Sequence, residues 1–239
     1  MRIVVFSGAG LSAESGIPTF RDSGGLWEQH RIEDVASPEG WRRDPELVLN
    51  FYAMRFRAQA GCAPNPAHEA IARLGSVHEV TNITQNIDTL LERAGCRDVW
   101  HLHGRIDMQK CERHRSLSFG EGDDMECDYR SRIERPVGSG DRCPKCGGAL
   151  RPDIVWFGEP VDLREGELMR LVASADIFIG VGTSAQVYPA AGLLPLFRNT
   201  PERYFIDPHP NYELLSGYTV LEGSASVRMP ELVDRLIGR

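Results

Sequence analysis

The alternation of apolar runs with longer segments predicts a parallel β-sheet. Short runs that are apolar and rich in β-branched residues recur along the chain and indicate buried strands. These runs occupy residues 3–6, 79–84, 99–102, 177–181, 204–206 and 218–221. Helical stretches lie between them, and such alternation is typical of an α/β fold. We therefore expect a Rossmann-like parallel sheet with helices on both faces.

Two segments interrupt this alternation and predict a second, smaller domain. Residues 26–66 contain a helical pattern around 45–60, whereas residues 107–152 are polar and rich in glycine, arginine and acidic residues. The second segment buries too little apolar surface to fold without a further stabilising element. We expect residues 1–25, 67–106 and 153–239 to form the sheet domain. The helical insertion 26–66 and a zinc-ribbon-like insertion 107–152 would form the small domain.

The turn after the first strand carries glycines that suit a phosphate-binding loop. Gly8 and Gly10 allow the backbone to turn sharply and approach phosphate oxygens, and a helix start presents free N–H groups. A dehydrogenase fingerprint would need a nearer third glycine than Gly16 and an acidic residue about 20 residues further on. Residues 18–21 instead read Pro-Thr-Phe-Arg, which adds an aromatic ring and a cation. This pattern favours an enzyme that cleaves the nicotinamide–ribose bond over one that transfers hydride.

Six motifs in order resemble those of the sirtuins, the NAD-dependent protein-lysine deacylases. They are GAGLSAESGIPTFR at 8–21, TQNID at 84–88, HLHG at 101–104, VWFGE at 155–159, GTS at 182–184 and GSA at 223–225. A glycine loop alone is a weak indicator, but this ordered set covers nearly the whole chain. The resemblance implies that NAD is consumed and that acyl-lysine in protein substrates becomes free lysine, with nicotinamide and O-acyl-ADP-ribose as the other products.

The resemblance also implies which residues contact NAD. We expect Arg21 to contact phosphate and Phe20 to cover the reacting face. Asp88 would accept a hydrogen bond from the carboxamide, although it also suits a helix N-cap. Asp207 stands where sirtuins usually have asparagine; its carboxylate suits both ribose hydroxyls and would repel a 2′-phosphate. The expected contacts are Gly8, Ala9, Gly10, Ser15, Thr19, Phe20, Arg21, Trp27, Gln85, Asn86, Ile87, Asp88, His103, Gly182, Thr183, Ser184, Asp207 and Ala225.

His103 is the residue that we expect to act as general base. An imidazole has an ordinary pKa of about 6.5 and can accept a proton at neutral pH. In sirtuins the histidine of this motif activates a ribose hydroxyl after the amide oxygen of the substrate has displaced nicotinamide. Asn86 is the second expected catalytic residue and would order water or the ribose. We interpret His101 as structural.

A Tyr-x-x-Arg pair predicts the acyl group. Tyr52 and Arg55 are three residues apart and therefore share one helix face. The pair resembles that of class III sirtuins, especially bacterial ones, which recognise acidic acyl groups. A guanidinium binds a carboxylate with two hydrogen bonds, and a phenol adds a donor. We predict desuccinylation and demalonylation together with deacetylation. The peptide itself would pair as an added strand with residues Val155, Trp156, Phe157 and Gly158.

Three positions depart from the class III pattern. Ser23 replaces an alanine at the acyl pocket, and Leu91 replaces a histidine that commonly follows the Gln-Asn-Ile-Asp motif. Asp153 replaces a histidine before the Val-Trp-Phe-Gly segment. We expect this carboxylate to lie near the substrate path, where it would weaken the binding of acidic acyl groups.

Four cysteines fall within the polar insertion. Cys143-Pro-Lys-Cys146 followed by two glycines is half of a zinc knuckle. Sirtuins carry a second such pair upstream, but here the sequence reads Cys111-Glu-Arg-His114. Either Cys127 or His114 completes the site, or no metal is held; we favour Cys127, which gives four thiolates from Cys111, Cys127, Cys143 and Cys146. Four protein ligands leave no open position, so this zinc would be structural.

Composition narrows the partners. A net charge of −7 over 239 residues argues against nucleic-acid or anionic-membrane binding, which requires clustered cations. No apolar run approaches the roughly 20 residues of a membrane span, and the first strand follows the amino terminus without a leader pattern. Six cysteines in such a chain do not suggest a disulfide framework. We therefore expect a cytoplasmic protein.

Other activities compatible with the motifs are NAD hydrolysis and ADP-ribosyl transfer, which cleave the same bond but use another acceptor. A catalytically quiet NAD sensor that binds acylated tails is a third possibility. Retention of His103 and of the Val-Trp-Phe-Gly segment favours deacylation over the first two, and the presence of every predicted polar catalytic residue argues against a quiet sensor.

Overall fold

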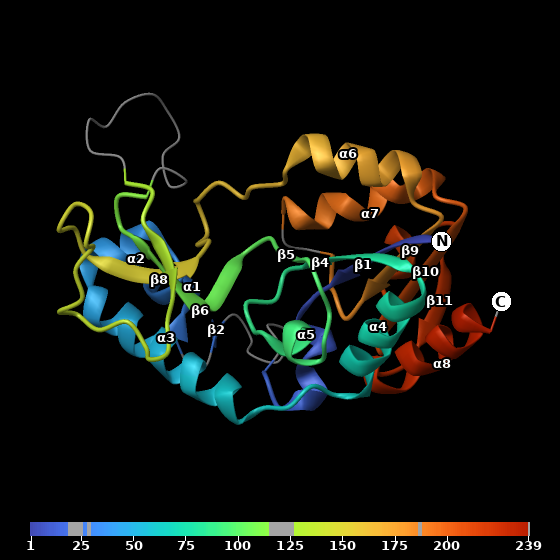
Figure 1. The fold of residues 1–239 in the computed structure, drawn as a ribbon, viewed down its shortest axis with the longest axis horizontal. Coiled ribbons are helices and arrows are strands. Elements are labelled where there is room, and N and C mark those ends of the chain that lie inside the picture. The colour runs from blue at the N-terminus through green and yellow to red at the C-terminus, as the bar shows by residue number, and fades with distance from the viewer. Residues whose placement is uncertain (19–25, 28–29, 115–126, 186–187, 239) are drawn as a thin grey trace.

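The chain forms a large parallel sheet and, beside it, a smaller domain (Figure 1). The computed structural model describes residues 1–18, 30–114, 127–185 and 188–238, and the backbone of 26–27. The six strands of the large sheet follow the order β11-β10-β9-β1-β4-β5, and every neighbouring pair is parallel. Their bounds are β1 (Arg2–Ser7), β4 (Glu79–Thr84), β5 (Val99–His101), β9 (Ile177–Val181), β10 (Glu202–Asp207) and β11 (Thr219–Glu222). The predicted α/β class is confirmed.

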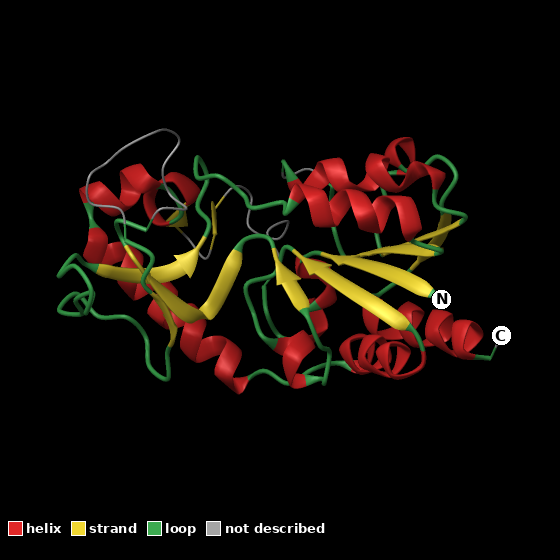
Figure 2. Ribbon diagram, turned by 45° about the horizontal axis from the view of Figure 1, so that its top comes forward, coloured by secondary structure: helices red, strands yellow, loops and turns green. Residues whose placement is uncertain are grey.

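Helices cover both faces of the large sheet (Figure 2). Alternate residues of β1 point to opposite faces. Ile3 and Val5 belong to the core on the side of α4 and α8, whereas Val4 and Phe6 belong to the core beside α6 and α7. Burial on both faces explains why this strand is a continuous apolar run. The helices are α4 (Pro66–Val77), α5 (Leu90–Arg93), α6 (Glu165–Ser174), α7 (Leu193–Leu196) and α8 (Ala225–Ile237).

The small domain combines helices from the first insertion with a three-stranded antiparallel sheet from the second. Its core joins Phe51 and Tyr52 of the first insertion to Cys111, Val137 and Leu150 of the second, so the two insertions share one buried cluster. Its elements are β2 (Leu26–Trp27), β3 (His30–Arg31), α1 (Ile32–Val35), α2 (Pro38–Arg43), α3 (Pro45–Gly61), β6 (Gly104–Cys111), β7 (Arg130–Arg132) and β8 (Leu150–Ile154).

Three helices begin with the same local device. Ser37, Asp44 and Asn65 are N-caps whose side-chain oxygens accept backbone hydrogen bonds of 2.9 Å from Gly40, Leu47 and Ala67. A proline follows each cap, where its missing N–H costs nothing. Short 3₁₀ helices span Ala9–Leu11, Ala13–Ser15, Ala190–Gly192, Phe197–Asn199 and Tyr212–Leu214. Among the described residues, no helix is both long and apolar enough to cross a membrane.

Candidate active site

The glycine loop after β1 touches the loop after β9. The Gly8 N–H donates to the Val181 carbonyl at 3.0 Å, and the Gly10 N–H donates to the Gly182 carbonyl at 2.8 Å. A Cβ on Gly10 would lie 2.7 Å from the Gly182 Cα, which no side chain can occupy. Only glycine permits this contact. Because β1 lies between β9 and β4, the two loops meet at the switch point where parallel sheets bind ligands.

The loop after β4 joins the same edge. The Gln85 N–H donates to the Ser7 carbonyl at 2.9 Å, and the Gln85 side chain donates to Thr183 Oγ1 at 2.8 Å. The structure therefore brings three of the expected NAD-contacting segments together, although they are far apart in the sequence. Thr183 is 4% exposed, so its hydroxyl is held by the fold before any ligand binds.

Ser12 connects the two expected nicotinamide-side residues. Its hydroxyl donates to Asp88 Oδ2 at 3.0 Å and accepts from Asn86 Nδ2 at 3.1 Å. Asp88 also accepts from the N–H of Leu90, the first residue of α5, although the N-cap of that helix is Thr89 rather than Asp88. Burial raises the pKa of Asp88, against the lowering effect of these hydrogen bonds. The sequence reasoning did not select Ser12, although it lies inside the glycine motif.

His68 of α4 approaches the same hydroxyl and was also missed. The Asn65 N–H donates to His68 Nδ1 at 3.2 Å, so Nδ1 is unprotonated and Nε2 carries the hydrogen. His68 Nε2 lies 3.4 Å from Ser12 Oγ. Burial lowers the pKa of His68 to about 4, which keeps the ring neutral. Two donors on the Ser12 oxygen leave its own hydrogen for Asp88.

His103 has the form that a general base requires. Its Nδ1 lies 3.1 Å from the Gln85 carbonyl oxygen. A carbonyl only accepts, so Nδ1 carries the hydrogen and Nε2 has the lone pair. Burial lowers the pKa of His103, more than the Gln85 hydrogen bond raises it. The ring is therefore neutral at pH 7.

The remaining expected NAD contacts lie around this edge or outside the described residues. Asp207 ends β10, is 3% exposed and accepts from the His209 N–H at 2.8 Å. Glu14, which was not expected, accepts from the N–H and hydroxyl of Ser226 in the first turn of α8. The expected residues found in these loops and element ends are Gly8, Ala9, Gly10, Ser15, Gln85, Asn86, Ile87, Asp88, Gly182, Thr183, Ser184, Asp207 and Ala225. Those outside the description are Thr19, Phe20, Arg21, Ser23 and the side chain of Trp27.

The expected peptide segment is bonded to the expected base. The Val155 N–H donates to the His103 carbonyl at 2.9 Å, and the Phe157 N–H donates to the Ala36 carbonyl at 3.0 Å. Tyr52, which is 2% exposed, accepts from Trp156 Nε1 at 3.1 Å. Burial raises the pKa of Tyr52 far above its usual value, so it stays a phenol.

A buried ion pair between Arg151 and Glu159 supports the expected peptide-binding segment. Arg151 donates to both carboxylate oxygens of Glu159, at 2.6 and 2.8 Å, and its guanidinium carbon lies 3.3 Å from the ring centroid of Trp156. Glu159 in turn accepts from the Trp156 N–H at 2.9 Å. The backbone of the segment is therefore fixed by the ion pair.

Asp153 does not have the position that the sequence suggested. It is 1% exposed on β8, where it pairs with Lys110 of β6 at 3.5 Å and with Arg130 of β7. In the small sheet β6 lies next to β8, and β7 lies on the far side of β6. The sheet therefore places the cations of Lys110 and Arg130 beside the one carboxylate of Asp153. Asp153 is thus a neutralised part of the small-domain interior rather than an exposed charge on the substrate path. Leu91 is likewise buried, in the core of the large domain.

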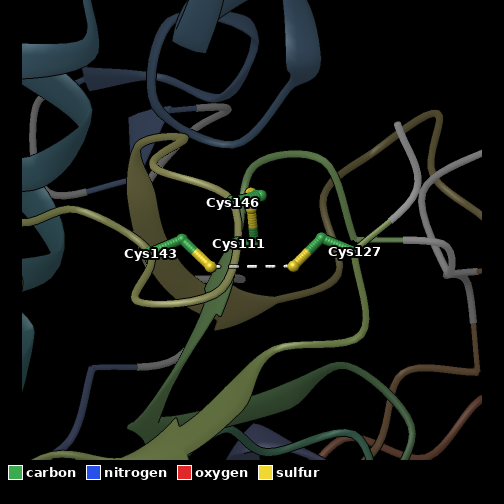
Figure 3. A group of neighbouring side chains, drawn as sticks. All are labelled: Cys111, Cys127, Cys143 and Cys146. Atoms are coloured by element: carbon green, nitrogen blue, oxygen red, sulfur yellow. Dashed lines mark hydrogen bonds between the residues drawn. The ribbon is translucent and has the colours of Figure 1, made fainter. Parts of the chain in front are cut away.

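Four cysteines converge in the small domain (Figure 3). The sulfur atoms of Cys111, Cys127, Cys143 and Cys146 all lie within 4.8 Å of one another. Two pairs are closer: 3.4 Å for Cys111 and Cys146, and 3.6 Å for Cys127 and Cys143. Tetrahedral zinc with bonds of about 2.3 Å requires sulfur atoms at this separation. The donor set fits a structural zinc ion, with Cys127 rather than His114 in the cluster.

The fold and the polar loops at the carboxyl edge of the sheet define a nucleotide-binding α/β protein. The Sir2 family model matches residues 8–189. A Helicobacter pylori protein named NAD-dependent protein deacylase is 43% identical over 236 residues, which cover 98% of this chain and 97% of that protein. A Bacteroides thetaiotaomicron protein of the same name is 44% identical, with the same coverage. The chain belongs to the Sir2 family.

Solved structures of Sir2 proteins are also similar to this chain. A Sir2 homologue in complex with NAD is 37% identical with a TM-score of 0.84, over 99% of this chain and 89% of that one. A Sir2 protein bound to a myristoylated histone peptide is 29% identical with a TM-score of 0.68, over 99% and 92%.

Proposed function

We propose that this Sir2-family chain is an NAD-dependent protein-lysine deacylase that removes succinyl and malonyl groups as well as acetyl. The observation that carries the proposal is the state of His103: a half-buried, neutral ring with a lone pair on Nε2. Its carbonyl also binds Val155, so the base and the segment proposed to hold the peptide are joined by one hydrogen bond. The names of the bacterial relatives support the same activity.

The polar loops supply the binding groups. Gln85, Thr183 and the glycine loop suit the ribose and phosphates of NAD. Asp88 suits its carboxamide, and Asn86 suits a water molecule or the ribose. Bound NAD supplies a labile nicotinamide–ribose bond and the hydroxyls that receive the acyl group. His103 Nε2 would accept the proton of a ribose hydroxyl and so make that oxygen a stronger nucleophile.

The preference for acidic acyl groups rests on Tyr52 and Arg55. The Tyr52 oxygen accepts from Trp156, which leaves its hydrogen to donate to a carboxylate. Arg55 follows one turn later on α3, and its guanidinium carbon lies 5.7 Å from the Phe51 ring centroid. A guanidinium in a partly buried place binds a carboxylate more strongly than one in water does.

The test is to incubate the protein with NAD and matched succinyl-lysine and acetyl-lysine peptides and to follow peptide mass and nicotinamide. We expect both peptides to lose their acyl group. Arg55→Met should abolish desuccinylation and spare deacetylation, whereas Arg57→Met, at an exposed position of the same helix, should change neither. Deacetylation alone, unaffected by Arg55→Met, would refute the acidic-acyl preference. Nicotinamide release without any peptide change would indicate NAD hydrolysis or ADP-ribosyl transfer instead.

We also propose a cytoplasmic location and protein rather than nucleic-acid partners. All six cysteines lie in the described residues and none forms a disulfide, which suits a reducing compartment. The net charge of −7 disfavours a nucleic-acid partner.

A further inference from the structure

The loop that carries Asn86 and Asp88 is fixed by hydrogen bonds from one short segment to four successive backbone carbonyls. Each carbonyl of residues 84–87 accepts a hydrogen bond from residues 101–106. The four bonds are Leu102 N to Thr84 O at 2.9 Å, His103 Nδ1 to Gln85 O at 3.1 Å, His101 Nδ1 to Asn86 O at 2.7 Å and Ile106 N to Ile87 O at 2.8 Å. Two of the four donors are histidine ring nitrogens, so these two bonds exist only while Nδ1 of each ring carries hydrogen.

The surroundings of His101 differ from those of His103 in one respect. His101 Nε2 lies 2.8 Å from Glu92 Oε1 of α5, and the His101 side chain is 5% exposed. Burial alone would raise the pKa of Glu92, but its hydrogen bonds, above all the one from His101, and the cation of Arg105 lower it. Glu92 is therefore a carboxylate, which only accepts. Both ring nitrogens of His101 face acceptors, and both must carry hydrogen.

We propose that His101 is a positioning residue of the active site: as an imidazolium paired with Glu92, it holds the Asn86 carbonyl and thereby the loop that receives the nicotinamide end of NAD. The inference rests on the proposed function for its kinetic consequences. His101 touches no reacting group; it acts through Asn86, whose side chain binds Ser12.

The charged groups around the pair favour this state. Asp88 lies on the loop itself, and Glu92 lies on α5; both carboxylates favour a cationic ring. Arg105 of β6 lies 3.6 Å from Glu92, but Asp107 engages its guanidinium twice, at 2.8 and 2.9 Å. His103 is neutral and adds no charge. The imidazolium therefore has two nearby anions and one largely compensated cation.

Substitution of His101 should distinguish a role in positioning the loop from a role in stability alone. His101→Phe removes a charge-assisted hydrogen bond, which corresponds to a fall of about 10-fold to 100-fold in kcat/KM for NAD. We expect the KM for the acyl peptide to stay within about twofold, since the peptide segment bonds to His103 rather than His101. A structural role alone would lower Tm without this split between the substrates.

Glu92→Gln provides the decisive comparison. A glutamine amide can turn its NH2 toward Nε2, so a neutral His101 keeps both hydrogen bonds. We expect Glu92→Gln to retain a near-normal kcat/KM for NAD at neutral pH. Glu92→Leu, which offers neither a carboxylate acceptor nor an amide donor, should lower kcat/KM for NAD as His101→Phe does.

The protonation itself is measured by ¹⁵N NMR of the imidazoles in the full chain, with His101→Phe for assignment. We expect two protonated nitrogens in His101 at pH 7 and one in Glu92→Gln. A singly protonated His101 in the wild type, or an unchanged kcat/KM for NAD in folded His101→Phe, would overturn the proposal. If the wild type neither deacylates nor releases nicotinamide, the proposed function fails, whereas the NMR result still decides the state of the pair.

Discussion

Tyr52→Phe tests the contact between the acyl-recognition helix and the peptide segment. Tyr52 and Trp156 are each 2% exposed, and the indole N–H of Trp156 donates to the Tyr52 oxygen. The substitution removes one oxygen and leaves the buried N–H without this acceptor. An unsatisfied buried donor costs about 1–3 kcal/mol, which lowers Tm by about 2–12 °C in a chain of this size.

The assay is thermal unfolding in a double-mutant cycle with Trp156→Phe. Removing both partners leaves no orphaned donor, so the double variant should lose about 1–2 kcal/mol less than the sum of the single variants. Tyr188→Phe is the matched control, because Tyr188 is 79% exposed and its change should leave Tm within about 1 °C. Desuccinylation should fall more than deacetylation in Tyr52→Phe. Additive losses, or a Tm equal to that of the control, would refute the coupling of the two side chains.

Three further predictions concern the metal, the pH response and the cofactor. Elemental analysis should find one zinc per chain in the wild type and in His114→Asn and Cys62→Ser, but none in Cys127→Ser; zinc loss with His114→Asn would contradict the four-thiolate site. Because burial lowers the pKa of His68 from about 6.5 to about 4, the unfolded state binds the proton more readily, and stability should fall as pH drops from about 6.5 to about 4, by up to about 3 kcal/mol. Denaturant unfolding from pH 7 to 4 should show this decline, and His68→Gln should flatten it; parallel curves would exclude His68 as the cause. Asp207→Asn should narrow the preference for NAD over NADP in a nicotinamide-release assay by at least about 10-fold, because one close pair of like charges costs about 1 kcal/mol in water and about 4 kcal/mol near a protein surface. An unchanged ratio would show that Asp207 does not face the 2′ position.

The short-range pattern predicted much of the fold. The strand at 79–84 and the helix beginning at Pro45 match the structure within a residue, because burial periodicity and caps are properties of neighbouring residues. The glycine loop could also be predicted from the sequence, because only a residue without a side chain allows the close backbone contact that Gly10 makes. The position of Asp153 could not be predicted from the local sequence. We expected its carboxylate to lie near the substrate path, yet the register of the small sheet sets it beside Lys110 and Arg130.

The sequence by itself determined the order of strands and helices, the family resemblance and the chemical groups available at each motif. Tertiary structure decided which of those groups meet. Ser12 and His68 are 56 residues apart, and His101 at the end of β5 reaches Asn86 in the loop after the neighbouring strand β4. Such contacts depend on how the chain returns to the sheet edge, which no local pattern encodes. Protonation states depend on these contacts in turn, because burial and facing partners determine which nitrogen carries hydrogen.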